Sequence, residues 1–366
     1  MTAPHPAGYS DNTSPDAIVA QVRACATPEE AGKFWTLMEE DLDGVSEKAR
    51  AAALAMRTEA CHVDFPRISA WQLPADVRGE LAVPYVEDGD RCHYLDVFYP
   101  ADALESDASE SDVLKSDVLE AGARTYPVVI DCHGGGFVYG TRELNRSFAM
   151  HLAHRGYVVV LPSYRPGPRF TFADILTDLS AAYSWTRENA TRFGGDVNRL
   201  FLTGDSAGGC MALYSAVLEA SSAFSAQSGI PQAGLDIRGL LLVCGVYDLA
   251  SCFDETATRG VLAGISAEVF ASVREKFAGF ESTAQLLDAV SLPPIFVNTA
   301  SDDFLHNENV DLYERLQAQG VYTELDDADA KKWGSLGHVY VVGLATHERA
   351  QKTLDAMDAF IQKVLG

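Results

Sequence analysis

Short, continuously apolar runs alternate with amphipathic helical patterns from residue 126 onwards, and this alternation is the strongest constraint on the fold. The apolar runs occupy residues 128–130, 158–161, 200–202, 240–243 and 295–297. Each run is too short for an exposed helix, and its lack of polar residues suits a strand that is buried on both faces. Strands that alternate with helices are typical of βαβ units. The sequence therefore predicts an α/β fold with a mainly parallel sheet flanked by helices.

The segments around this core are predicted from their helix and turn signals. Thr27, Pro28 and Glu30 form a helix start, so we expect helices from there to Met38 and around residues 48–57, after a weakly ordered stretch over residues 1–26. Residues 60–100 contain period-two runs, as leading antiparallel strands would. We divide the chain into an N-terminal helical segment over residues 1–60, which contributes to a cap, and a main domain over residues 61–366. Residues 251–290 interrupt the α/β rhythm and are predicted to be a cap insertion.

The acidic composition restricts the partners of the chain. The 366 residues include 28 Lys and Arg against 52 Asp and Glu, and the resulting net charge of -24 repels nucleic acids and acidic membranes. No stretch approaches the roughly 18 consecutive apolar residues of a membrane span. The seven cysteines are scattered without a Cys-x-x-Cys pair, so we expect neither a disulfide framework nor a zinc site. These features predict a cytoplasmic protein without a metal, nucleic-acid or membrane partner.

Residues 101–125 are dominated by Ser, Asp and Glu, and the sequence of residues 111–114 returns at 116–119. A five-residue echo is too short for a structural repeat unit. We interpret the segment as a solvated, flexible acidic loop, with a docking segment for a partner as the alternative, and we assign no chemistry to it.

A Gly-x-Ser-x-Gly pattern at residues 204–208 directly follows the predicted strand at 200–202. A serine pushed out on a sharp strand-to-helix turn needs neighbours without side chains, which Gly204 and Gly208 provide. The helix that follows presents free backbone N–H groups beside the serine, where an oxyanion would form. We therefore predict that Ser206 is a nucleophile and that the amide of Ala207 stabilises negative charge. A glycine-rich packing turn with an ordinary serine is the alternative.

A His-Gly-Gly-Gly-Phe sequence at residues 133–137 follows the strand predicted at 128–130. Consecutive glycines let the backbone turn its amides toward a neighbouring site, so we predict Gly134 and Gly135 as further oxyanion donors. A phosphate-cradling loop is the rival interpretation, but the Gly-x-x-x-x-Gly-Lys pattern is absent. We expect His133 to hold the loop by hydrogen bonding, because one histidine alone makes no metal site.

With these motifs the sequence resembles the hormone-sensitive lipase family of α/β-hydrolases, in its branch of bacterial short-chain carboxylesterases and acetyl esterases. The matching elements are residues 133–137, Ser-Tyr-Arg at 163–165, Phe-Gly-Gly-Asp-Val-Asn-Arg at 193–199 and Gly-Asp-Ser-Ala-Gly-Gly at 204–209, within a resemblance over about residues 85–365. The resemblance implies an eight-stranded α/β-hydrolase core, a helical cap built partly from the N-terminal segment, a Ser-Asp-His triad in that chain order, and no cofactor.

The acid and the base of such a triad have candidates in the C-terminal third. Asp302 and Asp303 follow the predicted strand at 295–297. Aligning Leu305 with the leucine of the family's Asp-Pro-Leu pattern selects Asp303, with Asp302 as the alternative, although Phe304 replaces the proline. His338 lies before the final helix, where the family carries its catalytic histidine. His306 is the competing base, and we interpret it as a capping or surface residue.

These residues predict a serine carboxylesterase that acts on small acetyl to butyryl esters through an acyl-enzyme. The aromatic residues Phe137, Tyr139, Tyr164 and Tyr247 are candidate walls of the substrate pocket, although aromatics next to a core strand are more often packing residues. An amidase, or a sugar or aryl deacetylase, could use the same triad, and a non-catalytic ligand-binding protein could share the scaffold. The natural substrate and the oligomeric state stay open, although dimers are common in folds resembling this one.

Overall fold

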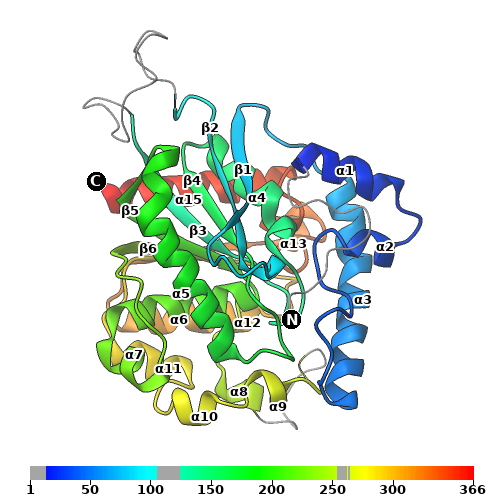
Figure 1. Ribbon diagram of the computed structural model, residues 1–366. Coiled ribbons are helices and arrows are strands. Elements are labelled where there is room, and N and C mark those ends of the chain that lie inside the picture. Colours follow the sequence, from blue (N-terminus) through cyan, green and yellow to red (C-terminus); the bar gives the residue numbers. More distant parts are fainter. Residues whose placement is uncertain (1–13, 105–123, 254–261, 263) are drawn as a thin grey trace.

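The computed structural model describes residues 14–104, 124–253, 262 and 264–366 (Figure 1). One eight-stranded sheet has the order β1-β2-β4-β3-β5-β6-β7-β8. β1 pairs with β2 and β2 with β4 in antiparallel fashion, and all other neighbouring strands are parallel. The prediction of a mainly parallel α/β sheet is therefore confirmed.

The predicted apolar runs all lie in strands. The strands are β1 (Val77–Pro84), β2 (Tyr94–Pro100), β3 (Tyr126–Cys132), β4 (Val158–Pro162), β5 (Gly195–Asp205), β6 (Ile237–Val243), β7 (Ile295–Ala300) and β8 (Thr323–Ala328). The helices that precede β5 are α1 (Pro15–Ala24), α2 (Pro28–Gly32), α3 (Glu47–Ser69), α4 (Arg146–His154) and α5 (Phe172–Asn189), with short 3₁₀ turns at Arg91–His93, Arg142–Asn145 and Ala190–Phe193. Those after β5 are α6 (Ala207–Ala220), α7 (Ser222–Ser228), α8 (Ala250–Phe253), α9 (Ser266–Val269), α10 (Val273–Lys276), α11 (Thr283–Ala289), α12 (His306–Ala318), α13 (Ala330–Trp333), α14 (Tyr340–Gly343) and α15 (Glu348–Leu365).

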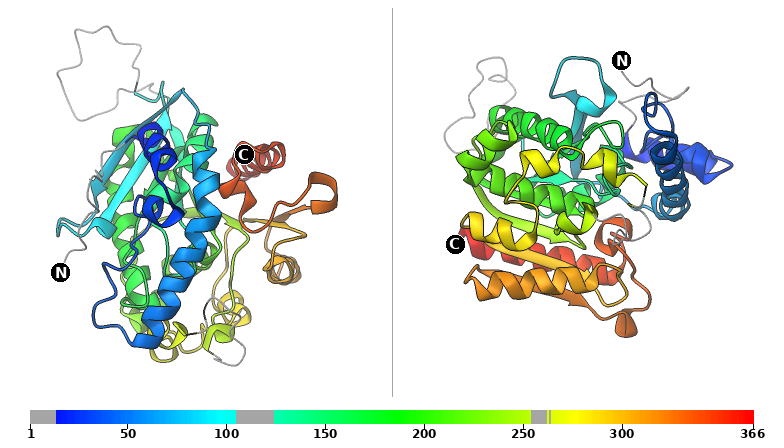
Figure 2. Two further views of the ribbon diagram at one scale, coloured as in Figure 1. Left: turned by 90° about the vertical axis from the view of Figure 1, so that its right-hand side faces the viewer. Right: turned by 90° about the horizontal axis from the view of Figure 1, so that it is seen from below.

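Helices cover both faces of the sheet, and alternate strand residues face opposite layers. Val128 and Ile130 belong to the apolar cluster that contains α5 and α6, whereas Val129 belongs to the cluster of α4 and α15. Figure 2 shows the sheet between these layers, with α3 alongside it. Burial on both faces explains why the strands read as continuous apolar runs rather than as alternating ones.

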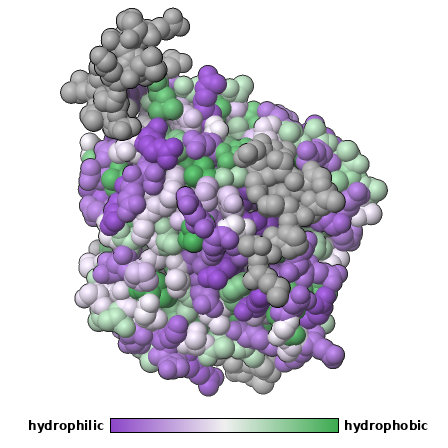
Figure 3. Space-filling model, in the orientation of Figure 1, coloured by the Kyte–Doolittle hydropathy of each residue, from purple (hydrophilic) through white to green (hydrophobic). Residues whose placement is uncertain are grey.

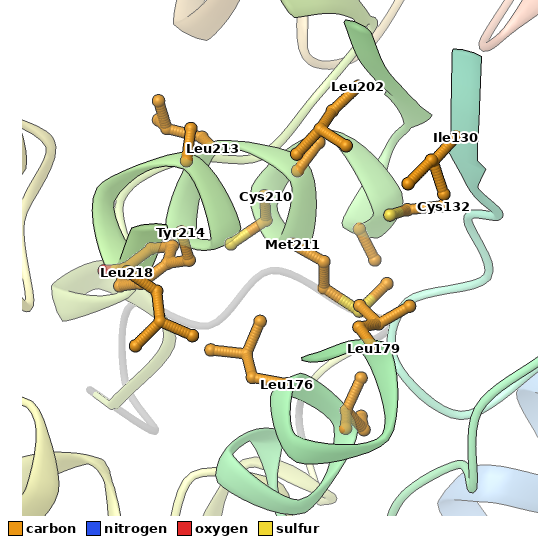
Figure 4. Packing of buried hydrophobic residues seen from close by; sticks show 14 of the residues in the cluster. Ile130, Cys132, Leu176, Leu179, Leu202, Cys210, Met211, Leu213, Tyr214 and Leu218 are labelled. Carbon is orange, nitrogen blue, oxygen red and sulfur yellow. The ribbon is translucent and has the colours of Figure 1, made fainter. Parts of the chain in front are cut away.

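The helix α6 follows the Gly-x-Ser-x-Gly turn and is unusually deeply buried. Every residue from Ala207 to Leu218 is buried. In Figure 4, Met211 of α6 points toward Leu179 of α5, and strand residues such as Leu202 close the cluster on another side. This packing fixes the N-terminus of α6, and with it the position of Ser206.

The N-terminal segment differs from the prediction. Helix α2 begins as expected, with Thr27 Oγ1 accepting a hydrogen bond from the Glu30 amide at 3.2 Å, but it ends at Gly32 rather than Met38. The Trp35 side chain is fully buried, and its Nε1 donates to the Tyr139 hydroxyl at 2.5 Å, so a tertiary contact overrides the local helical preference. Residues 15–24 form α1, so the prediction of a weakly ordered stretch over residues 1–26 is wrong there, and residues 1–13 lie outside the described residues.

Helix α3 is longer than the pattern predicted, because Cys61 and Ile68 continue its buried face to Ser69. The predicted boundary at residue 60 therefore falls inside this helix. Most of the acidic loop, residues 105–123, lies outside the described residues, as do residues 254–261 and 263 of the predicted cap insertion. The described remainder of that insertion forms α8, α9, α10 and α11.

Polar residues dominate the face of the molecule that Figure 3 shows. In Figure 3 hydrophilic residues cover most of the visible face, and hydrophobic residues are scattered among them. None of the helices in the described ranges combines the length and the apolar character that crossing a bilayer requires.

A buried ionic network anchors the start of α4, just after the glycine loop. Asp96 of β2 accepts hydrogen bonds from Arg142 Nε at 2.9 Å and from Arg146 Nε at 2.6 Å. All three side chains are fully buried, and Glu143 pairs with Arg142 at 3.1 Å. Burial opposes ionisation of Glu143, but the surrounding guanidinium groups hold the pKa of its carboxyl below the ordinary value.

We expect Asp96→Asn to lower the free energy of unfolding by about 3 kcal/mol or more, because it leaves buried guanidinium charge without its main counter-ion. Urea unfolding at neutral pH measures this change. Asp76→Asn is the matched control, because Asp76 pairs with His154 at the surface and should cost no more than about 1 kcal/mol. Equal losses in the two variants would contradict the importance of the buried network.

Candidate active site

Ser206 occupies a strained turn between β5 and α6. Its backbone has φ 53° and ψ -119°, a conformation that L-residues rarely adopt. A Cβ at Gly208 would collide with the carbonyl oxygen of Cys132, and one at Gly204 would collide with the backbone of Gly208. Both glycines are therefore required by close backbone approach, as the motif predicts.

Three of the predicted site residues lie in one hydrogen-bonded chain. His338 Nε2 lies 2.9 Å from Ser206 Oγ, and His338 Nδ1 lies 2.8 Å from Asp303 Oδ1. Burial opposes ionisation of Asp303, but the hydrogen bond and charge of His338, together with the Leu305 amide, lower the pKa of its carboxyl below the ordinary value. The carboxylate is thus ionised at neutral pH, and it fixes Nδ1–H as the donor, which leaves Nε2 to accept the Ser206 proton.

Asp302, the alternative acid, has a different task. Its Oδ2 accepts hydrogen bonds from Ser335 Oγ at 3.0 Å and from the amides of Leu336 and Gly337 at 3.0 and 3.1 Å. These contacts hold the loop that leads into His338. The geometry therefore favours Asp303 as the acid next to the imidazole. His306 is separate from this site and pairs with Asp327 at 3.0 Å.

The structure contradicts one predicted oxyanion donor. The Gly134 amide donates to Asp205 Oδ1 at 2.9 Å, so it is not available to a substrate. Within the described residues, the amides of Gly135 and Gly136 have no acceptor, and both residues line the same cavity as Ser206 and Ala207. Gly136 was missed because the contact between Gly134 and Asp205 joins residues far apart in the sequence. The presence of a third glycine in the run was the available signal.

Asp205 is itself held by this loop. Burial raises the pKa of its carboxyl, while hydrogen bonds from Asn145 Nδ2 and the Gly134 amide partly oppose the shift. Asn145 Nδ2 also donates to Asp131 at 3.0 Å, and burial next to Asp205 raises the pKa of Asp131 well above its ordinary value. Two buried carboxyls and one amide thus brace the glycine loop against the serine turn.

His133 holds the glycine loop by a hydrogen bond, as the sequence analysis predicts. Its Nδ1 donates to the Gly134 carbonyl at 2.8 Å, and its ring stacks on Tyr164 at a centroid distance of 4.2 Å. The Tyr164 hydroxyl donates to the His133 carbonyl at 3.0 Å. Burial lowers the pKa of His133 to about 4, so the ring is neutral at physiological pH.

The four predicted pocket aromatics divide into two pairs. Phe137 and Tyr139 contribute to a cavity of about 1070 Å³ that opens onto Ser206. Tyr164 and Tyr247 lie outside its walls, so the prediction is wrong for these two. Tyr164 braces His133, and the Tyr247 hydroxyl donates to Asn309 Oδ1 at 3.1 Å. Both aromatics therefore stabilise loops rather than contact a ligand.

The N-terminal helix α3 supplies cavity residues that the sequence motifs did not indicate. The Tyr139 hydroxyl donates to Asp64 Oδ2 at 2.9 Å, and Arg67 Nη2 donates to the His338 carbonyl at 3.3 Å. Asp64 also pairs with Arg67 at 3.4 Å. One turn of α3 therefore contacts both the glycine loop and the loop that carries the imidazole.

A metal site has one candidate in the described part of the chain. Ligand atoms of Cys244, Asp303 and His338 lie within 4.8 Å of one another. His338 Nδ1 and Asp303 Oδ1 are already hydrogen-bonded to each other. Burial raises the pKa of the Cys244 thiol well above its ordinary value. A neutral thiol is a poor ligand, so this chemistry favours the hydrogen-bonded chain over a metal centre.

The fold and the site define an α/β-hydrolase in which Ser206, His338 and Asp303 form one hydrogen-bonded chain. A family model described as alpha/beta hydrolase fold matches residues 129–337, more than half of the chain. The chain belongs to this family, in its hormone-sensitive lipase branch, as the motifs predicted.

Two curated relatives show the extent of the likeness. The chain is 30% identical over 207 residues to the isoprenylcysteine alpha-carbonyl methylesterase ICME of Arabidopsis thaliana, over 54% of this chain and 48% of the relative. It is 28% identical over 228 residues to carboxylesterase NlhH of Mycobacterium tuberculosis, over 60% and 69%. The chain spans about half the length of the isoprenylcysteine methylesterases that it matches.

Solved structures of esterase B from Lactobacillus rhamnosis share the fold. A complex with a C6-C4 SN3 inhibitor has a TM-score of 0.76 at 23% identity, over 87% of this chain and 97% of that one. A complex with a tributyrin phosphonate has a TM-score of 0.72 at 25% identity, with the same coverage.

The neutral, buried state of His133 makes a prediction about stability and pH. Its pKa is near 4 in the folded chain against 6.5 for an ordinary histidine, so the unfolded chain binds the extra proton first. This contribution to stability is complete above pH 6.5 and is lost as the pH falls toward 4, by up to roughly 3 kcal/mol.

Urea unfolding at pH 7 and at pH 4.5 should therefore show a smaller pH-dependent loss in His133→Asn than in the wild type. His62→Gln, at a half-exposed ring on α3, is the control and should keep the wild-type loss. The same pH dependence in wild type and His133→Asn would mean that His133 does not contribute.

Proposed function

We propose that the protein is a serine carboxylesterase that hydrolyses small, short-chain acyl esters through an acyl-enzyme. The observation that carries this proposal is the hydrogen-bonded chain from Asp303 through His338 to Ser206, which ends in a cavity lined by the amides of Gly135, Gly136 and Ala207. The relatives named carboxylesterase, methylesterase and esterase support ester hydrolysis.

The geometry supports the following sequence of steps. His338 Nε2 takes the proton of Ser206 as Oγ attacks the ester carbonyl. The amides of Gly135, Gly136 and Ala207 stabilise the oxyanion of the tetrahedral intermediate. The imidazolium then protonates the leaving alcohol, and a water activated by the same imidazole hydrolyses the acyl-enzyme. Asp303 stays ionised throughout and stabilises the imidazolium.

Charged groups in the wall of the cavity support the preference for short acyl chains. Glu59, Asp248, Asp311 and Arg315 line the cavity together with many apolar side chains. A long acyl chain would remove some of these charged groups from water, which costs free energy. The structurally similar esterase B has been solved with a tributyrin phosphonate inhibitor. We place the protein in the cytoplasm, since all seven cysteines are free, and we assign α1 to α3 to the cap.

Hydrolysis of p-nitrophenyl acetate, butyrate, octanoate and palmitate tests the proposal. We expect turnover of the acetate and butyrate, little turnover of the palmitate, and a loss on the order of 10⁶-fold in kcat for Ser206→Ala. Faster hydrolysis of matched anilides than of esters would favour an amidase. Absence of turnover, together with no labelling of Ser206 by a phosphonate, would favour a binding protein on this scaffold.

The neighbouring acids should respond differently to the same substitution. Asp303→Asn removes the charge that fixes the His338 tautomer, so we expect kcat to fall on the order of 10⁴-fold. Asp302→Asn weakens only the loop before His338, and we expect a loss below about 10-fold with a stability cost of about 1 kcal/mol. The two variants are compared on p-nitrophenyl acetate and by urea unfolding. A larger kinetic loss in Asp302→Asn would reverse the assignment.

A further inference from the structure

Phe304 is the most exposed large hydrophobic residue in the described part of the chain. Its exposed fraction is 66%, and the other exposed large hydrophobics, Val63, Leu104 and Tyr322, reach at most 50%. Phe304 lines the cavity that opens onto Ser206, so an apolar group of a bound ligand can cover it.

The Phe304 ring lies directly against the imidazole of the triad. The centroids of the Phe304 and His338 rings are 4.3 Å apart, with the planes tilted by 40°. The carboxyl of the preceding residue, Asp303, accepts a hydrogen bond from the same imidazole. The Phe304 ring therefore forms the part of the cavity wall that lies beside the imidazole.

The position of Phe304 beside His338 determines which part of a bound ester lies against its ring. The carbonyl oxygen of the substrate points to the amides of Gly135, Gly136 and Ala207, and the acyl carbon bonds to Ser206. The leaving oxygen must lie within about 3 Å of His338 Nε2 to receive its proton. The group attached to that oxygen is consequently the part of the substrate that lies beside Phe304.

We propose that Phe304 determines specificity for the alcohol portion of the ester, and that the preferred alcohols carry a flat apolar ring, as benzyl-type alcohols do. The inference rests on the proposed esterase function and names the substrate class of that same site. A flat ring can stack on the exposed face of Phe304 in offset or edge-to-face geometry. A saturated ring of similar size covers the same area without this match, and a short alkyl group leaves Phe304 exposed.

Three acetate esters test this inference: benzyl acetate, cyclohexylmethyl acetate and ethyl acetate. All three form the same acetyl-enzyme, so deacylation is common to them, and only the acylation step, read as kcat/KM, depends on the alcohol. We expect the wild type to prefer benzyl acetate, and Phe304→Ala to lower kcat/KM for it about 10-fold while changing that for ethyl acetate less than about 3-fold.

Two further variants complete the experiment. Phe304→Tyr keeps the flat ring and should restore the benzyl preference. Tyr322→Ala removes an exposed aromatic residue that lies outside the cavity walls, and it should leave all three rates unchanged. Because Phe304 is exposed, Phe304→Ala should also unfold at nearly the wild-type urea concentration.

Equal losses on the three esters in Phe304→Ala would overturn the inference, since they would show that Phe304 acts through His338 and not through the alcohol. A wild type without a benzyl preference would overturn it as well. Either result leaves ester hydrolysis itself intact. A wild type that hydrolyses none of the three esters and resists phosphonate labelling would instead refute the proposed function, and the inference with it.

Discussion

The positive φ of Ser206 is the constraint on which the rest of the site depends. Holding a non-glycine residue in such a conformation costs on the order of 1–3 kcal/mol, which the surrounding structure must offset. The Ser206 amide donates to the Val243 carbonyl at 2.9 Å, and its carbonyl accepts from Gly209 at 3.1 Å. The buried helix that begins at Ala207 cannot shift without losing its packing on both the sheet and α5. The packing of α6 therefore offsets the backbone strain of Ser206, and the serine side chain stays exposed to the cavity.

Positioning of the other reacting groups relies on contacts between distant segments. Arg57 of α3 donates to the Val138 carbonyl at 2.8 Å and forms a buried pair with Asp41, so the helix fastens the end of the glycine loop. Nearly three turns further along, α3 reaches the His338 loop through Arg67. Helix α3 consequently contacts both the end of the glycine loop and the loop that carries His338. A displacement of α3 would disturb both loops together rather than one of them alone.

Local patterns predicted the parts of the structure that local physics determines. The strands, the serine turn and the start of α2 follow from apolar runs, glycines and a capping residue, all within a few positions. The end of α2, the length of α3 and the engagement of Gly134 depend on Trp35, Ile68 and Asp205, whose partners are distant in sequence. Tyr164 and Tyr247 show the same limit, because an aromatic residue near a site is recognisable from the sequence but the direction of its side chain is not.

Three adjacent residues, 302–304, make three different contacts at the site. Asp302 accepts from the loop before His338, Asp303 bonds to the imidazole, and Phe304 covers the ring from the cavity side. These residues lie in turns between β7 and α12, where the Asp303 amide donates to the Ala300 carbonyl and the His306 amide to the Asp303 carbonyl, so adjacent side chains point to three separate targets. The carboxyl that is buried against the imidazole is held ionised, whereas its neighbour works by accepting several hydrogen bonds at the surface. Because one short loop carries all three contacts, a change in its backbone would disturb the base, the acid and the wall of the cavity at the same time.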